Sequence, residues 1–507
     1  MGRTLALRRT AHIRAFALAM FASLALQPPL HALETDQYYA WGHPLADGTD
    51  VVNAKFNLEL QRAIDSFEDQ PNECVEIAVR FRKRMRFILF HPIETWAMHT
   101  SLVARVPEDG DEFVEYRRNS MYRFHGPFDT GMWMPMTPTI QVNGIRIGTD
   151  KLSHFVSSGW TYYVSRQKAL DRGMSEAEAE EAAVRRGLLE ERLILGEAVD
   201  GILSIADLEA GLPGMQLYVD LCGGSGPVLA TEQGSWSIKR PIDLRNYVHP
   251  GWDESYRNSI FRDHRWEKVE RGLKQYCALR DDPWVLARWG RYCELDRRTA
   301  IQQKVEGMVD DGRLPDPARF GLDAVCGETG AAGDPGPAFQ RPPVDLPPSG
   351  DLQDLIIAEE GDTERRAVPV AALRLTYPQI ASLSYGVLLT RLPVEYDCRV
   401  PCDMWGGFAQ IEPGLGGGKA SVGWGRLIGE QRQGRPFLSG VFLAMAGKAT
   451  VLRTWGDESP LPANQGYVGG EFEFSVARVN MGVGALHRVS GDDGREWVFT
   501  GHLGWGF

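Results

Sequence analysis

The segment "GTDKLSHFVSSGWTYYVSRQKAL" contains the residues of this chain whose types and spacing best suit acid–base chemistry. Thr149 or Asp150 can cap a helix that begins near Lys151. On that helix Asp150 precedes His154 by one turn, so its carboxylate is close enough to orient the imidazole and raise its basicity. His154 would then be a general base with Asp150 as its partner, and a nearby serine would be the nucleophile of a hydrolase or transferase.

The same helix has two other interpretations. Its polar and nearly uncharged face consists of His154, Ser158, Thr161 and Ser165. This face becomes a metal site if carboxylates of the next helix approach it, and the candidates are Glu190, Glu197 and Asp200. It is structural if Asp150 only caps the helix and His154 packs against a neighbour. No G-x-S-x-G or H-E-x-x-H motif in the segment decides among the three roles.

Two further groups contain candidate histidines. "NYVHPGWDES" places His249 and Asp253 in a Pro/Gly turn, and irregular loops often carry binding and catalytic residues. His91, His99 and His125 would form a histidine cluster with His154 if the fold brought them together. No residue set specifies a cofactor, so the sequence predicts none.

Four stretches of the first half resemble a family of exported Gram-negative envelope proteins to which no activity is assigned. They are "ETDQYYAWGHPLADGTDVVN", "GTDKLSHF", "SIADLEAGLPGMQLYVDLC" and "DLRNYVHPGWDES", and together they extend over roughly 34–260. The piece "DKLSHF" also resembles the D-K-x-x-H-F element of small periplasmic lipoproteins. The resemblance implies a place in the cell envelope and assigns no catalytic residue.

The elements that position these candidates belong to a chain of 507 residues, which is long enough for two or three domains. The net charge of -12, with no concentrated basic patch, argues against nucleic acid as a partner. The hydrophobic content of 43% is ordinary for globular proteins and excludes a multi-helix membrane protein.

The first 32 residues have the features of a signal peptide. "MGRTLALRRTAHIR" is basic, "AFALAMFASLAL" is an apolar run too short to span a bilayer, and Ala32 is a plausible last residue before cleavage. Export would place the seven cysteines in an oxidising compartment. Since the number of cysteines is odd, at least one cysteine is free or pairs between chains. A disulfide between Cys398 and Cys402 would close a small loop.

The composition divides the remaining chain into three parts. Residues 33–326 are typical of one mostly helical globular domain. Residues 327–351 are rich in Gly and Pro and indicate an extended, semi-rigid linker. The last domain is 352–507, and from about Val370 it shows repeated alternation of apolar residues with Gly, Ser, Asn and a few charged residues, as in "LSYGVLL" and "EFEFSV".

This alternation favours a membrane barrel over a soluble sandwich. Small and polar residues suit the narrow lumen of a small barrel, and apolar runs that end in aromatics suit a band of lipid contact. Strands in hydrocarbon must close on themselves, because an unpaired edge is too costly there. The span leaves room for about eight strands. Glu471 and Glu473 would then face the lumen and pair with Lys419, Arg426 or Lys448.

The last strand, "WVFTGHLGWGF", carries the most specific part of this pattern. Trp497, Phe499, Leu503, Trp505 and Phe507 fall on one side of the alternation. A terminal strand that ends in Phe507 resembles the C-terminal signal of bacterial outer-membrane barrels. The resemblance implies two partners, the insertion machinery and outer-membrane lipid.

We therefore predict a multidomain α and β protein: a mostly helical N-terminal periplasmic domain and a small antiparallel β-barrel of the outer-membrane type. The first functional hypothesis is an envelope protein whose barrel is an anchor or interaction platform. The second is an envelope hydrolase or transferase that uses Asp150 and His154. The third is a soluble periplasmic binding protein whose β-domain is not in the membrane.

Overall fold

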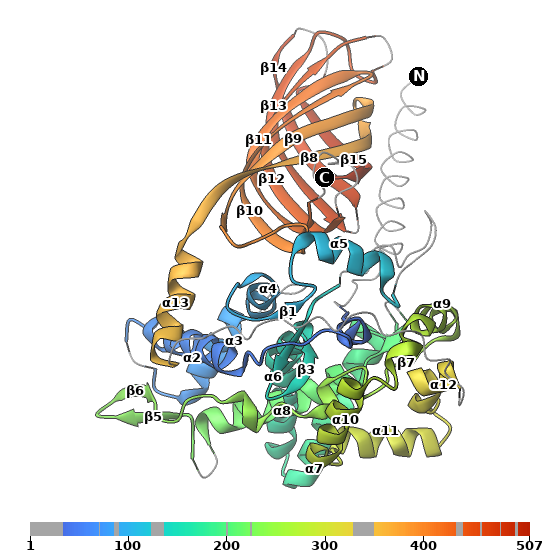
Figure 1. Cartoon of the computed structure of the whole chain (residues 1–507). Coiled ribbons are helices and arrows are strands. Elements are labelled where there is room, and N and C mark those ends of the chain that lie inside the picture. Colours follow the sequence, from blue (N-terminus) through green and yellow to red (C-terminus); the bar gives the residue numbers. More distant parts are fainter. Residues whose placement is uncertain are drawn as a thin grey trace.

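A mostly helical domain and an eight-stranded β-barrel make up the molecule (Figure 1). The computed structural model describes residues 34–69, 71–85, 91–122, 136–198, 201–223, 226–327, 349–431, 440–456, 459–476, 478–491 and 495–507. The signal peptide predicted for 1–32 and nearly all of the predicted linker lie outside the described residues. The mixed helical and β composition agrees with the predicted fold class.

The helical domain is built around two helices that lie side by side, α6 (Asp150–Leu170) and α8 (Ile205–Cys222). The other helices are α2 (Thr49–Asp65), α3 (Cys74–Met85), α4 (Pro92–His99), α5 (Gly110–Asn119), α7 (Glu176–Glu190), α9 (Asp263–Leu273), α10 (Pro283–Leu295), α11 (Ala300–Asp310) and α12 (Leu322–Cys326). Short strands join them: β1 (Arg105–Val106), β2 (Thr139–Val142), β3 (Ile145–Gly148), β4 (Ile202–Leu203), β5 (Leu229–Glu232), β6 (Ser235–Ile238) and β7 (Ile260–Phe261).

Two glycines allow α6 and α8 to approach closely. A Cβ atom on Gly214 would lie 1.9 Å from the carbonyl oxygen of Phe155, and one on Gly159 would lie 2.5 Å from the backbone of Gly214. Any larger residue at either position would force the helices apart. This contact brings the first turns of the two helices together, and these turns hold the candidate site.

The cysteines form three disulfides, Cys74–Cys222, Cys277–Cys326 and Cys398–Cys402. The third is the small loop that the sequence predicted. Cys293 is free and exposed, which accounts for the odd number of cysteines. The first bridge fastens α3 to the last residue of α8.

Eight antiparallel strands close into a barrel in which β15 pairs with β8 (Figure 1). The strands are β8 (Thr363–Tyr377), β9 (Ile380–Pro393), β10 (Cys402–Gly414), β11 (Gly417–Glu430), β12 (Gly440–Thr454), β13 (Gly466–Val476), β14 (Val479–Ser490) and β15 (Trp497–Gly506). The number of strands agrees with the prediction. The long apolar stretch at 440–454 forms the single strand β12.

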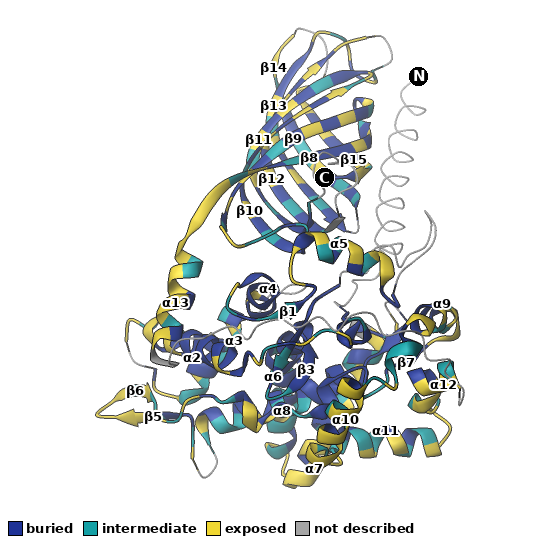
Figure 2. Cartoon of the chain, in the orientation of Figure 1, coloured by how far each residue is buried: buried dark blue, intermediate teal, exposed yellow. Residues whose placement is uncertain are grey.

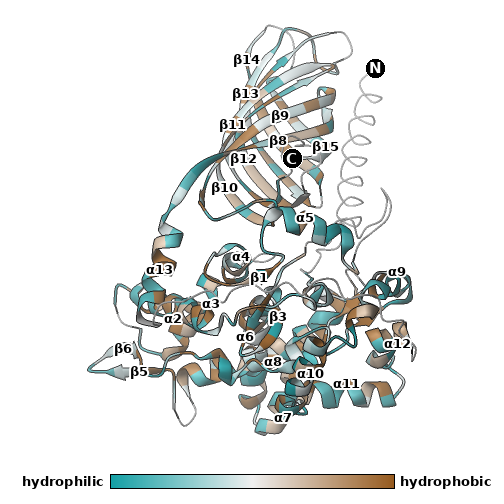
Figure 3. Ribbon diagram, in the orientation of Figure 1, coloured by the Kyte–Doolittle hydropathy of each residue, from teal (hydrophilic) through white to brown (hydrophobic). Residues whose placement is uncertain are grey.

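Side chains alternate between the two faces of the barrel wall. Along the strands, exposed and buried residues follow each other with period two (Figure 2), and apolar residues recur along the wall (Figure 3). The exposed large apolar residues of the wall include Leu375, Tyr385, Leu389, Trp405, Ile411, Val422, Trp424, Val451, Phe472, Val483, Trp497, Phe499, Leu503 and Trp505. The wall therefore presents apolar side chains outward over its length.

The barrel interior is filled by ion pairs. Arg374 is fully buried between Glu412 and Glu473, and Lys448 also pairs with Glu473. Lys419 lies 2.9 Å from Glu471. The predicted pairing of the two lumenal glutamates with Lys419 and Lys448 is therefore confirmed.

The third predicted lumenal cation has another partner. Arg426 pairs with Asp403, and both side chains are partly exposed near the end of the barrel that faces the helical domain. In the alternation of β11, Arg426 shares the outward parity of Val422 and Trp424, so it does not point into the lumen.

The start of the barrel differs from the prediction. Residues 349–361 form helix α13 (Ser349–Gly361), which crosses the predicted domain boundary at 352, and the first strand begins at Thr363, earlier than the alternation predicted from about Val370. Leu352 and Ile356 of α13 are buried in the core that contains α2 and α6. The helix forms there because its apolar residues find that core, which a composition reading does not reveal.

The last residue also differs from the alternation. Phe507 is 5% exposed and packs with Met404, Phe408 and Leu427 in an apolar cluster inside the barrel, at the end next to the helical domain. The preceding Gly506 has a φ of +112°, a conformation that favours glycine, and this reverses the side on which the next residue lies. Phe507 thus leaves the outward row of Trp505 and Leu503.

The helical domain contacts the end of the barrel at which the first strand, β8, begins and the last strand, β15, ends. Ile428, Leu443 and Val476 of the barrel are buried in one core with residues of the helical domain. The His99 ring of α4 lies 2.9 Å from the Pro401 carbonyl oxygen, and Arg117 of α5 pairs with Glu430. Within the described residues, every helix is too short or too polar to cross a membrane.

Candidate functional site

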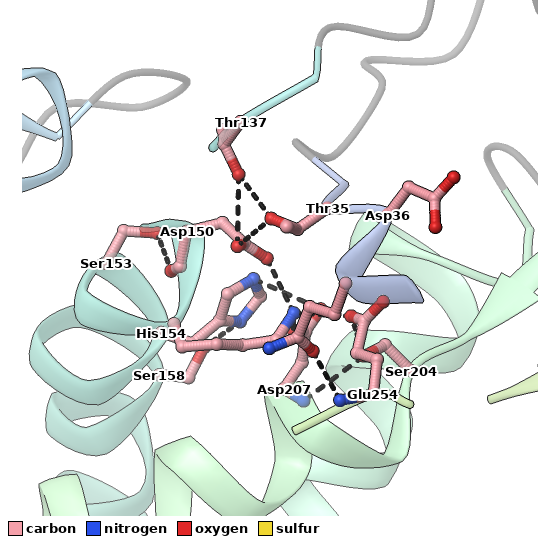
Figure 4. Close-up of polar contacts among 12 residues, drawn as sticks. Thr35, Asp36, Thr137, Asp150, Ser153, His154, Ser158, Ser204, Asp207 and Glu254 are labelled. Atoms are coloured by element: carbon pink, nitrogen blue, oxygen red, sulfur yellow. Dashed lines mark hydrogen bonds and ion pairs between the residues drawn. The ribbon is translucent and has the colours of Figure 1, made fainter. Parts of the chain in front are cut away.

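The ammonium group of Lys151 lies at the centre of a buried charged cluster. Its Nζ donates to Asp150 Oδ2 at 2.6 Å, to Asp207 Oδ1 at 2.5 Å and to Glu254 Oε1 at 2.5 Å. Asp150 and Lys151 belong to α6, Asp207 to the first turn of α8, and Glu254 to the loop after the short helix Pro250–Trp252. Figure 4 shows Asp150, Asp207 and Glu254 converging on this point. We call these four residues the buried centre.

Burial and pairing act against each other on the groups of the buried centre. Burial would lower the pKa of Lys151, but the three carboxylates hold that pKa well above its ordinary value. Burial would raise the pKa of Asp150, but Lys151 brings it below the ordinary value. Burial raises the pKa of Glu254 to about 7, against the opposing effect of Lys151. The cluster therefore contains one permanent cation and one carboxyl that titrates near neutrality.

Asp150 is held in place by hydroxyl groups from two distant segments. Its Oδ1 accepts hydrogen bonds from Thr35 Oγ1 at 2.7 Å and from Thr137 Oγ1 at 3.2 Å. A Cβ atom on Gly148 would lie 2.1 Å from Asp150 Oδ1, so the glycine in "GTDK" leaves the room that this carboxylate needs. Asp150 is the first residue of α6, and Thr149 occupies the N-cap position without a side-chain cap hydrogen bond, so Asp150 anchors the cluster and the predicted side-chain cap is not formed.

His154 contacts a carboxylate on the neighbouring helix. Its Nε2 lies 3.2 Å from Asp207 Oδ2, and its Nδ1 lies 3.5 Å from Ser158 Oγ (Figure 4). The spacing predicted that Asp150 orients this ring, but the carboxylate that contacts it is Asp207. Asp150 Oδ1 accepts hydrogen bonds from the two threonines, and its Oδ2 accepts one from Lys151. The histidine is therefore not satisfied by its own helix alone.

The arrangement supplies the order of groups that nucleophilic catalysis uses. A hydroxyl, an imidazole and a carboxylate follow one another in Ser158, His154 and Asp207. The same region also offers metal ligands, since ligand atoms of Asp150, His154 and Asp207 lie within 4.8 Å of one another. Lys151 already bonds to both of these carboxylates, so the cluster carries its own cation where a metal would bind.

The second pair of candidates, His249 and Asp253, has partners outside the buried centre, although Asp253 directly precedes Glu254. His249 Nδ1 accepts from the backbone of Gly251, its Nε2 lies 3.7 Å from Glu209 Oε2, and burial lowers its pKa to about 4. Asp253 accepts from the backbone of Ser255 at 2.9 Å and from Tyr292 Oη at 3.1 Å. Both residues therefore have contacts that fasten the loop.

The predicted histidine cluster does not form among the described residues. His91 Nδ1 lies 2.9 Å from the Met85 carbonyl oxygen and its Nε2 lies 3.2 Å from Ser157 Oγ. His99 stacks on Tyr396 at the domain junction. His125 lies outside the described residues.

The carboxylates proposed as metal ligands also lie elsewhere. Glu197 pairs with Arg192 at 2.7 Å, and Glu190 ends α7. Asp200 lies outside the described residues. The carboxylate that reaches His154 comes from the start of α8.

Sequence reasoning therefore missed Lys151, Asp207 and Glu254. All three fall inside the stretches "GTDKLSHF", "SIADLEA" and "YVHPGWDES" that carried the family resemblance. Asp207 had an available signal, a charge within the largely apolar start of α8, because buried charges are normally paired.

A comparison with protein-family models, curated proteins and solved structures finds no match for this chain.

Proposed function

We propose that this chain is an outer-membrane-anchored envelope protein, in which the barrel holds the helical domain at the periplasmic face of the membrane. The observation that carries the proposal is the band of exposed apolar residues around the barrel wall. Phe499 is 74% exposed and Leu375 69%, values that a soluble β-domain rarely tolerates in such number. Strands of 10 to 15 residues are also long enough to cross a bilayer.

The placement of tryptophans supports the same proposal. Trp405 and Trp505 lie near the end of the barrel next to the helical domain, whereas Trp455 and Trp497 lie at the opposite end. Exposed Leu, Ile and Val side chains occupy the wall between them. Aromatic girdles on both sides of an aliphatic band are typical of barrels in the outer membrane.

The filled lumen favours an anchor over a pore. Eight strands enclose an interior that side chains can fill, and here the ion pairs of Arg374, Lys419 and Lys448 occupy it. Three disulfides also agree with an exported protein. The terminal strand that ends near Phe507 is the segment we propose for recognition by the insertion machinery.

Fractionation of Gram-negative cells that express the full chain tests the proposal. We expect the protein in the outer-membrane fraction after an alkaline carbonate wash, with a band on a detergent gel that shifts on boiling. Recovery in the soluble periplasmic fraction, without a heat-dependent shift, would instead support the soluble binding protein.

A second function is favoured by the contacts of His154. We infer that Ser158, His154 and Asp207 form an acid–base site of an envelope hydrolase or transferase, with Asp150 holding Lys151 beside it. Labelling with a fluorophosphonate probe tests this without knowledge of the substrate. The site predicts labelling of the wild type that is lost in Ser158→Ala and in His154→Gln. Labelling that persists in Ser158→Ala, or none in the wild type, would remove this function.

A further inference from the structure

The two carboxylate oxygens of Glu254 have different surroundings. Oε1 accepts from Lys151 Nζ at 2.5 Å and from Ser204 Oγ at 3.1 Å. Oε2 is buried and has no hydrogen-bond partner among the described residues. A carboxylate oxygen that is removed from water without a partner is costly, so we expect a hydrogen-bond donor beside Oε2.

Two hydroxyl groups near Glu254 are likewise buried without a hydrogen-bond partner among the described residues. They are Tyr122 Oη and Ser259 Oγ. Tyr122, Glu254 and Ser259 all line one cavity of about 10 Å³, whose remaining walls include Phe261, Leu273 and Phe320. Three polar groups without partners among the described residues therefore belong to residues that line one small space, Tyr122 after α5 and Glu254 with Ser259 in a single loop.

The size and polarity of this cavity fit a single water molecule. A cavity needs a volume of roughly 10–15 Å³ to hold one water, and a buried water makes two to four hydrogen bonds. Apolar cavities of similar size stay empty, but this one has an acceptor in Glu254 Oε2 and two hydroxyls that can donate or accept. A water molecule can both donate to a carboxylate oxygen and accept from a hydroxyl, and a cavity of about 10 Å³ does not hold anything larger than a few atoms.

We propose that this cavity is a binding site for one ordered water molecule, held by Tyr122, Glu254 and Ser259. The water donates a hydrogen bond to Glu254 Oε2 and accepts one from a hydroxyl. From Glu254 the contacts continue through Lys151 to Asp207 and on to His154. The inference concerns the helical domain and does not depend on where the barrel resides.

The sign of a stability change tests the proposal in the full chain. If water is bound, Tyr122→Phe removes one of its partners and lowers the urea midpoint of the helical domain, measured by pulse proteolysis. If the cavity is dry, the same change removes an unsatisfied hydroxyl and leaves the midpoint unchanged or raises it. Ser259→Ala is expected to act in the same direction as Tyr122→Phe.

Tyr218→Phe is the matched control, because the hydroxyl of Tyr218 donates to the Val156 carbonyl oxygen at 2.9 Å and its loss must be costly. We expect Tyr122→Phe to lower the midpoint by a similar amount. A Tyr122→Phe variant at least as stable as the wild type would overturn the proposal. So would a high-resolution crystal structure with no density within hydrogen-bonding distance of the three oxygens.

Discussion

At the residue scale, the site depends on one buried lysine, because the ammonium group of Lys151 bonds to Asp150, Asp207 and Glu254. The spacing of Asp150 and His154 predicted a polar turn at the start of α6, and both residues lie in the site. The partners Asp207 and Glu254 come from segments far along the chain, and local spacing has no information on such contacts. The buried Lys151, which organises the three carboxylates, was passed over because lysine is almost always exposed.

Removal of the central cation is predicted to be severe. In Lys151→Met three carboxylates lose their common partner, and loss of one member of a buried ion pair costs about 3–5 kcal/mol. We expect this loss of unfolding free energy in urea titrations followed by pulse proteolysis. The control Lys239→Met removes an exposed pair with Glu232 and should cost less than about 1 kcal/mol. Equal effects of the two variants would contradict a buried centre.

The raised pKa of Glu254 predicts a pH-dependent effect of its replacement. Because the folded-state pKa is about 7 and the ordinary value is 4.5, the folded chain binds more protons than the unfolded chain between these values. The contribution of Glu254 to stability therefore decreases as the pH rises through this window. Glu254→Gln cannot titrate, so its stability relative to the wild type should increase from pH 5 to pH 8. A difference that stays constant with pH would contradict the raised pKa.

At the element scale, the alternation in the last third of the chain was sufficient to predict strands, because period two is a local property. Helix α13 and the inward turn of Phe507 were not predictable in the same way. The first depends on a core formed by α2 and α6, and the second on the backbone conformation of Gly506. Both are tertiary effects that override the local pattern.

Two substitutions on one strand separate lipid from water as the neighbour of the barrel wall. Val483 lies in the middle of β14 and Val489 near its end, and both are exposed. In a bilayer, Val483→Arg should cost about 2–4 kcal/mol and Val489→Arg about 0–1 kcal/mol. Guanidinium titrations of each variant in phospholipid vesicles measure its unfolding free energy, with the folded fraction read from the heat-dependent shift on a detergent gel. On a water-exposed wall both substitutions would be nearly neutral.

At the scale of the whole molecule, the filled lumen and the attached helical domain suit an anchored periplasmic protein. Helix α13 fastens the barrel to the helical domain: Glu359 accepts from Thr100 Oγ1 at 2.6 Å and from the backbone of Ser101 at 2.7 Å. The alternation predicted the lumenal pairs of Glu471 and Glu473, but it predicted neither the part of Arg374 in that network nor the junction, because these contacts join residues from distant strands and helices.

The ion pairs inside the barrel predict that it does not conduct. Arg374 and its carboxylate partners cross the lumen, so ions have no open path. Planar bilayers that contain the full chain should show no stepwise current at either polarity. Regular single-channel steps, abolished by heat denaturation of the protein, would show that the lumen opens.

The central claim is that lipid surrounds the outward face of the barrel, and spin-label accessibility along β15 tests it most directly. In a Cys293→Ser background, single labels replace Phe499, Thr500, His502 or Leu503 in the full chain in phospholipid vesicles. We predict high accessibility to oxygen and low accessibility to a water-soluble nickel complex at 499 and 503, where the side chains are exposed, and low accessibility to both at 500 and 502, where they are buried. Higher accessibility to nickel than to oxygen at 499 and 503 would contradict the membrane placement.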